Sequence, residues 1–444
     1  MRNQTLTLPH LYGIMKVLVL GSGGREHALA WKISQSPLCS RLYVAPGNAG
    51  THQCAQNVPI EVTNFDKLAD FIAQNEIELV VVGPEAPLAA GWVDFLYQRF
   101  APDQVRVIGP NQVAAQLESS KHFAKQFMQR HQIPTAAYRS FNLYSLQEGI
   151  DYLATLPPPY VLKADGLASG KGVLIINNLA EAQAALREMI VERKFGQASQ
   201  TVVVEQFLQG IELSVFILTD GKDYLLLPAA KDYKRVGEGD TGPNTGGMGA
   251  VSPVPFADAT FMQKVQERII EPTLAGLRKE GIDYLGFIFF GLMNVAGDPY
   301  VIEYNVRLGD PETEVILPRI KSDLLALLDA ASRRTLSHTS LEIDPRIAVT
   351  VMLTSEGYPG TFEKGKPINQ IDKISTEVIA FHAGTALQND FVVTAGGRVI
   401  ALTALADTMQ EALEKTYTAA NIIHYHGKYY RRDIGQDLKK FGLF

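Results

Sequence analysis

The sequence IEYNVRLGDPE at positions 302–312 decides how the fold of the whole chain is interpreted. Residues 300–304 alternate well enough to form a short strand, which places Glu303 and Asn305 on the same face. Two oxygen donors on one strand face suit a hard cation such as Mg²⁺, which binds one or two carboxylates together with phosphate oxygens. Arg307 continues this face, and its planar fork suits a carboxylate or a phosphate. The alternative interpretation is a strand with a solvated polar face.

Length and composition limit the class of protein. The 444 residues exceed one ordinary core, and this length suggests roughly two to four domains. A hydrophobic content of 46%, a charged content of 20% and a formal charge of −6 are typical of a globular protein without general affinity for nucleic acid or acidic membranes. Cys39 and Cys54 are too few for a disulfide framework and fit no zinc motif.

Neither a membrane span nor a signal peptide is expected. No apolar run reaches the length of about 18 residues that a membrane span needs, and residues 1–14 lack the pattern of a signal peptide. Met15 looks like a natural start, so residues 1–14 are expected to be an N-terminal extension of a cytoplasmic protein.

A glycine turn at residues 21–24 follows the buried strand expected at residues 17–20 and precedes a helix. Free backbone N–H groups and the helix dipole favour an anion at such a turn. The dinucleotide motif G-x-G-x-x-G fails because Glu26 occupies its sixth position, and no acidic residue ends the second strand, residues 42–44. The pattern therefore favours a phosphorylated sugar over NAD, and a tight turn without a ligand is the alternative.

Two more buried strands are expected at residues 79–82 and 105–108, each ending in a loop with Gly and Pro. Four such strands indicate a small parallel sheet whose loops gather at the carboxyl ends. Glu85 in one of these loops is expected to meet a sugar hydroxyl or an amine, or to cap a helix. The first domain is expected to end near Ser119, inside the helical stretch 112–131.

A glycine loop at residues 164–172 lies between strands expected at residues 160–163 and 173–176. It is not a P-loop, because no Ser or Thr follows Lys171 and because it leads into a strand. A glycine loop in a hairpin can instead fold over nucleotide phosphates as a flap, and Lys163 can point at the same phosphates. A flexible hairpin without a ligand is the alternative.

Two later segments have polar groups suited to ligands. A strand at residues 202–208 passes into residues 210–214, where an adenine would find backbone donors and acceptors and Glu212 would reach ribose hydroxyls. Residues 231–249 are expected to form a long polar, glycine-rich loop, and such loops inside compact domains are usually functional or disordered.

The last part of the chain is expected to contain strands, a hairpin through residues 395–398 and a helix at residues 408–422. His382, His424 and His426 invite a metal interpretation, but His424 and His426 lie two positions apart without an acidic partner. We therefore expect surface histidines.

Six stretches together resemble the family of glycinamide ribonucleotide synthetases (phosphoribosylamine–glycine ligases), which are ATP-grasp enzymes of purine synthesis. They are GSGGREHALAWK (21–32), APGNAGT (45–51), VGPEAPL (82–88), KADGLASGKGV (163–173), DTGPNTGGMGA (240–250) and RLGDPETE (307–314). They occur in the family's order and cover nearly the whole chain from Met15. The resemblance implies that ATP, glycine and 5-phosphoribosylamine give ADP, phosphate and glycinamide ribonucleotide through glycyl phosphate.

The resemblance also implies an α/β and α+β multidomain fold. The expected parts are the extension 1–14, a Rossmann-like N-terminal domain at 15–119, an ATP-grasp domain at 120–333 with a mobile lid at about 135–207, and a small α+β C-terminal domain at 334–444.

The site residues implied by the resemblance fall into four groups. Lys121, Lys163 and Arg307 are expected to be catalytic, with Arg307 on the glycine carboxylate. The metal ligands are Glu303 and Asn305. The ATP-binding residues are Lys121, Lys163, Gly166, Ser169, Gly170, Lys171, Gly172, Glu205, Phe207, Leu208, Glu212 and Asn305. The substrate-binding residues are Gly23, Gly24, Arg25, Glu26, Pro46, Gly47, Asn48, Gly83, Pro84, Glu85, Asp232, Asn244, Gly246, Gly247, Arg307 and Asp310.

One departure from the family pattern concerns the metal. Residues 287–293 contain no acidic side chain where many ATP-grasp enzymes have a further metal ligand. A second Mg²⁺ or Mn²⁺ is therefore expected to depend on phosphate, water or an acid elsewhere, such as Glu314.

The expected ligands are ATP, Mg²⁺ or Mn²⁺, glycine and phosphoribosylamine, without nucleic acid or membrane, in a monomer or a dimer. Two other functions stay open. Another ATP-grasp carboxylate–amine ligase or carboxylase would share the core, and a non-enzymatic nucleotide-binding or dinucleotide-dependent protein would lack the ligation.

Overall fold

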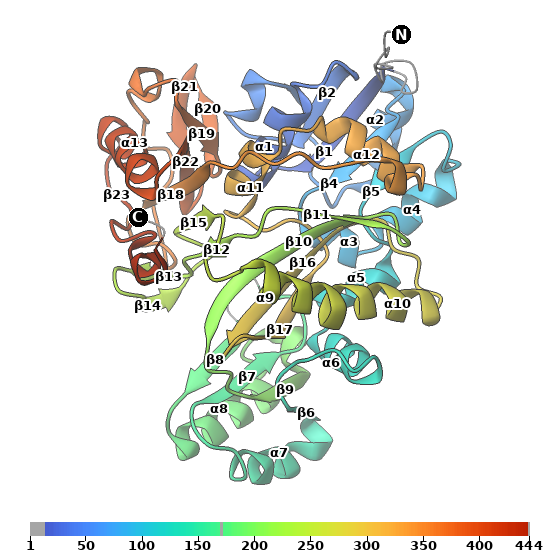
Figure 1. Ribbon diagram of the computed structural model, residues 1–444, viewed down its shortest axis with the longest axis vertical. Helices are drawn as coiled ribbons and strands as arrows, with labels where there is room; N and C mark the ends of the chain where they lie inside the picture. The colour runs from blue at the N-terminus through green and yellow to red at the C-terminus, as the bar shows by residue number, and fades with distance from the viewer. Residues whose placement is uncertain (1–13, 169–171, 443–444) are drawn as a thin grey trace, which may run out of the picture.

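A computed structural model describes residues 14–168 and 172–442. Figure 1 shows the N-terminal sheet and the C-terminal sheet side by side, the central sheet below them, and a small α+β unit at the opposite end. No helix in these residues is long and apolar enough to cross a membrane.

The N-terminal sheet is parallel and has the strand order β3-β2-β1-β4-β5. Its strands are β1 (Met15–Gly21), β2 (Cys39–Pro46), β3 (Gln56–Asn57), β4 (Leu79–Val82) and β5 (Arg106–Ile108). Its helices are α1 (Gly24–Ile33), α2 (Phe65–Asn75), α3 (Glu85–Ala89) and α4 (Trp92–Arg99). The four expected strands are confirmed, and the additional strand β3 has no apolar run that would have revealed it.

Helices α5 (Gln112–Ser119) and α6 (Lys121–Arg130) divide the helical stretch that the sequence predicted. Ser120 separates them because its backbone is extended and its hydroxyl accepts a hydrogen bond from the N–H of Phe123. A serine in this role caps the new helix and places Lys121 in its first turn.

The small unit at the far end of Figure 1 carries the strand order β6-β9-β7-β8 and its own hydrophobic core. Its elements are β6 (Tyr138–Asn142), α7 (Leu146–Leu153), β7 (Tyr160–Ala164), β8 (Val173–Ile176), α8 (Leu179–Val191) and β9 (Thr201–Gln206). Strands β7 and β8 pair antiparallel, so the predicted hairpin around the glycine loop is confirmed. Ser169, Gly170 and Lys171 lie outside the described residues.

The central sheet has the order β11-β10-β16-β17. Its edge strand β17 contains the first residues of the stretch 302–312. Its strands are β10 (Ile211–Thr219), β11 (Tyr224–Leu226), β16 (Gly286–Val295) and β17 (Asp298–Asn305). Helix α9 (Ala259–Val265), a π-helical segment (Gln266–Ile270) and α10 (Glu271–Lys279) follow one another in line beside this sheet (Figure 1).

The predicted polar loop 231–249 is partly wrong, because it contains short strands. Strands β13 (Arg235–Gly237) and β14 (Thr241–Asn244) pair with each other. Strand β12 (Lys231–Asp232) pairs with β15 (Gly249–Ser252), which begins at the end of the loop and pairs with β18 (Ile347–Ser355). The partner strand begins almost one hundred residues later, so local composition could not reveal this pairing.

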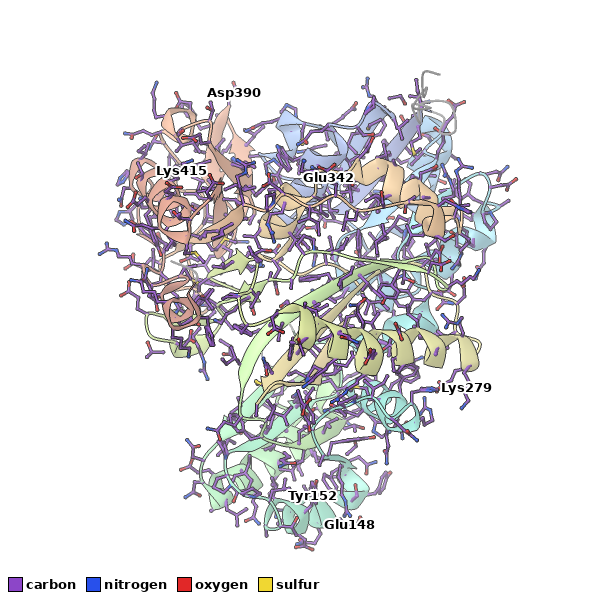
Figure 2. The ribbon with its side chains drawn as sticks, in the orientation of Figure 1. Glu148, Tyr152, Lys279, Glu342, Asp390 and Lys415 are labelled. Carbon is purple, nitrogen blue, oxygen red and sulfur yellow. The ribbon has the colours of Figure 1, made fainter. Side chains whose placement is uncertain are left out.

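The C-terminal sheet continues from β18 to β22 (Arg398–Ala406) and β19 (Val378–His382), with β23 (Lys428–Tyr429) also on β18 and α13 (Met409–Ile422) packed against it. The predicted hairpin through residues 395–398 is wrong. Strand β21 (Phe391–Thr394) pairs with β20 (Thr385–Gln388), and the residues in question carry the chain from this small sheet to β22. The actual hairpin turns at Asn389 and Asp390, which both have positive φ, and Asp390 lies at its outer tip (Figure 2).

Helices α11 (Thr313–Arg319) and α12 (Leu324–Ser332) connect the sheets. Helix α11 lies between α1 of the N-terminal sheet and β18 of the C-terminal sheet, and α12 packs against β5. The sequence at α11 has no strong turn signal and no helical periodicity of apolar residues. The reason is that nearly all residues of this helix are buried between domains.

The prediction that His382 lies on the surface is wrong. His382 is 1% exposed, and its backbone N–H donates to Nδ1 of His27 at 2.8 Å. The two histidines therefore belong to the contact between α1 and β19.

Candidate functional site

A buried carboxylate holds two lysines at the boundary between the small unit and the central sheet. Oε2 of Glu205 on β9 lies 3.0 Å from Nζ of Lys163 on β7 and 3.0 Å from Nζ of Lys125 on α6. Lys163 also donates to the backbone oxygen of Ile302 at 3.3 Å. This last bond places a predicted phosphate-binding lysine beside Glu303 on β17.

Lys125 was missed by sequence reasoning. It is 2% exposed, and its Nζ donates to Oγ1 of Thr135 at 2.7 Å. Burial lowers the pKa of Lys125 to about 8, although Glu205 opposes this shift. The available signal was its position one helical turn after Lys121, but a lysine at such spacing is more often solvated.

Glu205 does not present its carboxylate as a free ligand group. Both lysines contact Oε2, while Oε1 is buried and has no hydrogen-bond partner in residues 14–168 and 172–442. Phe207 and Leu208 follow the end of β9, and Phe207 is 37% exposed. The side chain of Glu205 thus orients lysines, while the backbone after it remains the candidate hinge for an adenine.

The candidate metal seat is formed by β17. Burial raises the pKa of Glu303, but nearby Lys234, Lys121, Lys163 and Arg307 lower it more, so the net pKa is below its usual value. Oδ1 of Asn305 accepts from Nη2 of Arg307 at 3.1 Å, whereas its Nδ2 is buried without a partner among the described residues. An ionised carboxylate and an amide oxygen are ligand types that fit a hard divalent cation, so the metal would bind Asn305 through Oδ1.

A cavity of about 10 Å³ adjoins Glu303 and is lined by Glu212, Asp232 and Lys234 among others. Nζ of Lys234 lies 2.8 Å from Oε2 of Glu212, so the residue predicted to bind ribose is ion-paired here. Within the described ranges, no three His, Cys, Asp or Glu side chains are placed to hold a metal by themselves. A cation at Glu303 would therefore also need the Asn305 amide and oxygens from a ligand.

Arg307 is fixed by two carboxylates from the N-terminal part of the chain. Its Nη2 lies 2.6 Å from Oε1 of Glu118 on α5, and its Nε lies 3.4 Å from Oε2 of Glu85. Oε2 of Glu118 also accepts from the N–H of Val306 at 2.8 Å. Sequence reasoning missed Glu118, since nothing local distinguishes a glutamate near the end of a helix.

The glycine turn before α1 is filled by carboxylates. The N–H of Gly23 donates to Oε2 of Glu26 at 2.6 Å, and the N–H of Arg25 donates to Oδ2 of Asp310 at 3.2 Å. A side chain on Gly83 would collide with Glu26, which explains the glycine in that loop. Two N–H groups that the sequence assigned to an anionic ligand are thus already used by the protein.

Asn48 links the N-terminal sheet to the C-terminal domain. Its Oδ1 accepts from the N–H of Gly50 at 2.8 Å, and its Nδ2 donates to the backbone oxygens of Ser22 and His382, each at 2.8 Å. Both polar atoms of this amide therefore have internal partners. The preceding Gly47 donates its N–H to Gly21, and Pro46 ends β2.

Arg398 on β22 contacts two predicted substrate-binding residues, Gly246 and Asp310, where the N-terminal sheet meets the C-terminal domain. Its Nη1 donates to the backbone oxygens of Gly246 and Asp310, each at 2.7 Å, and lies 3.0 Å from Oδ1 of Asp310. Gly247 approaches Pro311 so closely that a side chain there would clash. Asn244 instead lies exposed on β14, and among the described residues it makes no hydrogen bond to this cluster.

The remaining predicted site residues lie either near Arg307 or on the side of the glycine loop and Lys234. Pro84 lies directly before helix α3, which begins at Glu85. Glu85 is the residue that contacts Arg307. Gly166 donates its N–H to Ala198, and the backbone oxygen of Gly172 accepts from Ala164, so both flank the glycine loop. Burial raises the pKa of Asp232 while Lys234 opposes the shift.

Glu314 does not extend the metal seat. It is completely buried at the start of α11, and its neighbours are Gly24, Ala383 and Asp310 rather than Glu303 or Asn305. The suggestion that it replaces the missing metal ligand is therefore not supported by its position.

Three family models match consecutive parts of the chain. They are described as phosphoribosylglycinamide synthetase N domain (residues 15–118), ATP-grasp (A) domain (residues 119–313) and C domain (residues 348–437). The phosphoribosylamine–glycine ligase of Chlorobaculum tepidum is 48% identical over 428 residues, covering 95% of this chain and 99% of that protein. The ligase of Pseudomonas aeruginosa is 47% identical over 425 residues, covering 95% and 97%.

Solved structures agree with this match. The crystal structure of phosphoribosylamine–glycine ligase from Thermotoga maritima has a TM-score of 0.81 and 37% identity, covering 94% of this chain and 99% of that one. Biotin carboxylase from Campylobacter jejuni, at 16% identity and a TM-score of 0.71, covers 96% of this chain and 95% of its own, and shares the fold.

Proposed function

The chain belongs to the phosphoribosylglycinamide synthetase family, and on this premise we propose which of its residues carry the reaction. The protein is an ATP-dependent ligase that joins glycine to 5-phosphoribosylamine and forms glycinamide ribonucleotide in purine synthesis. ATP and a divalent metal serve this ligation. The observation that carries the residue assignment is the bond from Lys163 to Ile302, which brings the lysine pair and the Glu303 strand to one place.

The reaction requires an activated carboxylate. The carboxylate of glycine is a poor electrophile, so one of its oxygens must first become a leaving group. An oxygen of glycine attacks the γ-phosphorus of ATP, ADP leaves, and glycyl phosphate forms. The amine nitrogen of phosphoribosylamine then attacks the carbonyl carbon, phosphate leaves, and the amine loses one proton. Holding both reactants in register contributes up to roughly 7–11 kcal/mol in well-oriented systems.

We assign the nucleotide phosphates to Lys121 and Lys163. Lys163 is kept in place by Glu205, whose charge Lys125 shares. Glu303 and Asn305 would hold Mg²⁺ or Mn²⁺, which supplies charge neutralisation on the transferring phosphoryl group when it is bound. The glycine loop 164–172 would cover the phosphates and exclude water from the acyl phosphate.

Glycine is assigned to Arg307. Glu118 and Glu85 hold its guanidinium from one side, which fixes the direction of the planar fork before glycine arrives. A preoriented guanidinium selects a carboxylate by geometry as well as by charge.

Phosphoribosylamine is assigned to the loops at the carboxyl ends of the parallel sheet and the facing loop from β22. Arg398, which lies 3.0 Å from Asp310, and the guanidinium of Arg25, which is paired with Glu26, supply positive charge for its phosphate. Glu85 and Asp310 offer acceptors to ribose hydroxyls or to the amine. The N–H of Gly23 in the glycine turn is not assigned to this phosphate, because it already donates to Glu26.

The other assignments stay part of the proposal. They comprise domain limits at 15–119, 120–333 and 334–444, a cytoplasmic location, and a monomer or dimer. The choice between Mg²⁺ and Mn²⁺ is decided by comparing activity after metal removal and replacement.

The function is tested by a coupled assay of ADP release. ADP should form only when glycine and freshly made phosphoribosylamine are present together, with glycinamide ribonucleotide as the product. ADP release driven by another acid or amine would assign the chain to a different ATP-grasp ligase. Tight NAD binding without ATP turnover would favour the non-enzymatic alternative.

A further inference from the structure

Glu314 is a completely buried carboxyl group without a donor. It is 0% exposed, and neither of its oxygens receives a hydrogen bond from any described residue. Its Oε1 occupies the space that a side chain on Gly24 would need, and Ala383 of the C-terminal domain lies opposite. An ionised carboxylate in such a position would lose its hydration without compensation, which strongly favours the neutral acid.

The group that Glu314 does face is another carboxyl group. Oδ2 of Asp310 lies against Gly23 and Oε1 of Glu314 lies against the next residue, Gly24, so the two carboxyl groups are neighbours. Oδ1 of Asp310 lies 3.0 Å from the Arg398 guanidinium and, like both oxygens of Glu314, has no hydrogen-bond partner among the described residues. Its Oδ2 accepts from the N–H of Arg25. Two carboxyl oxygens can bond to each other only when one carries a proton, since ionised carboxylates are acceptors alone.

We propose that Glu314 stays in its neutral acid form, donates its proton to a hydrogen bond with Asp310, and thereby positions Asp310 at the junction of the three domains. The inference rests on the proposed phosphoribosylamine site, because Asp310 and Arg25 belong to it. Glu314 acts through Asp310 and is therefore a positioning residue.

The surrounding charges assign the proton to Glu314. Burial and then the Asp310 charge raise the pKa of Glu314 well above its usual value, and Glu312 adds to this effect. Burial also raises the pKa of Asp310, but Arg398 and Arg25 lower it more, so its net pKa is below the usual value. Asp310 is thus the anion of the pair.

The other titratable groups on the neighbouring elements do not reverse this assignment. Helix α1 contributes Arg25, Glu26 and His27, and Glu26 is bound to Arg25. Burial lowers the pKa of His27 to about 3, with His382 adding to the shift, and burial lowers that of His382 to about 4. Both histidines are neutral near pH 7, so Arg398 is the cation that faces Glu314 from the C-terminal side.

A neutral acid here adds a donor without adding charge. Asp310 stays the anion of the carboxyl pair, and its oxygens are held by the N–H of Arg25 and the guanidinium of Arg398. Loss of the Glu314 proton would place two buried anions in contact, which repel each other. Asp310 would then shift, and with it the end of α1 and the Gly246 loop.

The direct test is infrared spectroscopy of the unliganded protein. At about pH 8 the wild type should show the C=O stretch of a protonated carboxyl group, shifted in D₂O, and Glu314→Gln should remove it. This pH lies above the pKa of Glu312, which burial raises to about 7, so Glu312 contributes little. Glu342→Gln is the control, since the side chain of Glu342 is 66% exposed. An unchanged band in Glu314→Gln would overturn the proposal.

The kinetic test distinguishes the loss of a hydrogen-bond donor from a change in side-chain volume. Glu314→Gln keeps a donor and should leave the KM for phosphoribosylamine within about twofold, without the rise that ionisation causes in the wild type at alkaline pH. Glu314→Leu fills the space without a donor and should raise that KM roughly tenfold or more, with the KM for ATP unchanged. The proposal would be contradicted if Glu314→Gln and Glu314→Leu changed this KM equally. It would also be contradicted if the KM of Glu314→Gln rose at alkaline pH as it does in the wild type. The infrared measurement needs no turnover, so its result does not depend on whether the proposed function is correct.

Discussion

The nucleotide side of the molecule gathers lysines, whereas the junction of the three domains gathers carboxyl groups. Around Glu303, the lysines Lys121, Lys163 and Lys234 all lower the pKa of one carboxylate. Around Asp310 at the junction, Glu26 and Glu314 are both buried, with Arg25 and Arg398 as the cations.

The difference follows the ligands assigned to each region. The phosphates of ATP carry several negative charges, so a site rich in ammonium groups is stabilised when ATP binds. A sugar amine brings hydroxyl and N–H donors, which need acceptors. Excess acids are tolerated at the junction because burial raises the pKa of Glu312 to about 7 and the pKa of Glu314 well above its usual value, which favours their neutral forms.

The largest effect is expected at the nucleotide side from Glu303→Ala. Removing the carboxylate that the lysines surround should lower turnover at least roughly hundredfold, a loss typical of removing one group that stabilises transition-state charge. The measurement is the steady-state rate at saturating Mg²⁺, with circular dichroism as a check of folding. Asp298→Ala on the exposed start of the same strand is the matched control. Full activity of Glu303→Ala would remove the metal assignment.

Arg307→Lys tests the border between the two regions. A point charge replaces a planar fork that Glu118 and Glu85 hold, so we expect the KM for glycine to rise about tenfold. The KM for phosphoribosylamine should change little. An unchanged glycine KM would show that the guanidinium serves only to join α5 to β17.

Lys125→Met should have a smaller effect on the nucleotide side. Without Lys125, Glu205 keeps Lys163 as its single cation and holds it more strongly, so the KM for ATP should rise roughly threefold with kcat nearly unchanged. Methionine fills a similar volume, and replacing a buried ion pair by apolar groups is often tolerated. Lys415→Met on the surface of α13 (Figure 2) is the control. A fall in kcat with an unaltered KM would argue against a role in placing Lys163.

Glu312→Gln probes the junction through stability. The folded pKa of Glu312, about 7, lies above the ordinary value of 4.5, so the folded protein binds this proton more tightly than the unfolded chain does. The resulting stability is present below about pH 4.5 and is lost as pH rises through about 7. The variant should therefore gain stability relative to wild type between about pH 5 and pH 8, by at most a few kcal/mol. Urea unfolding at several pH values measures this, and a pH-independent difference would refute it.

Much of the local structure was predictable from the sequence. The strands at residues 79–82 and 173–176 were placed at their observed limits, because short apolar runs between glycine and proline loops have few other conformations. The helix at residues 408–422 was placed within one residue, since Thr408 caps it. The strand β15 was missed, as its ladder partner β18 lies far along the chain.

The candidate site was predictable in its residue types but not in its contacts. Glu303, Asn305 and Arg307 could be placed on one strand face from their spacing alone. Glu118, which holds Arg307 across 189 positions, and Lys125, which shares Glu205, carried no local signal. His382 was placed on the surface, whereas its contact with His27 joins groups 355 positions apart.

The sequence by itself determined the family, many of the strands and helices, and the residue types that are proposed to bind phosphate, metal and glycine. These properties depend on spacing along the chain, which the backbone converts directly into faces and turns. The tertiary structure decided which carboxyl groups are charged and which lysines are already paired. A pKa depends on burial and on the nearest charge, and for Asp310 and Glu314 both are set by segments from three domains that meet only in the folded protein.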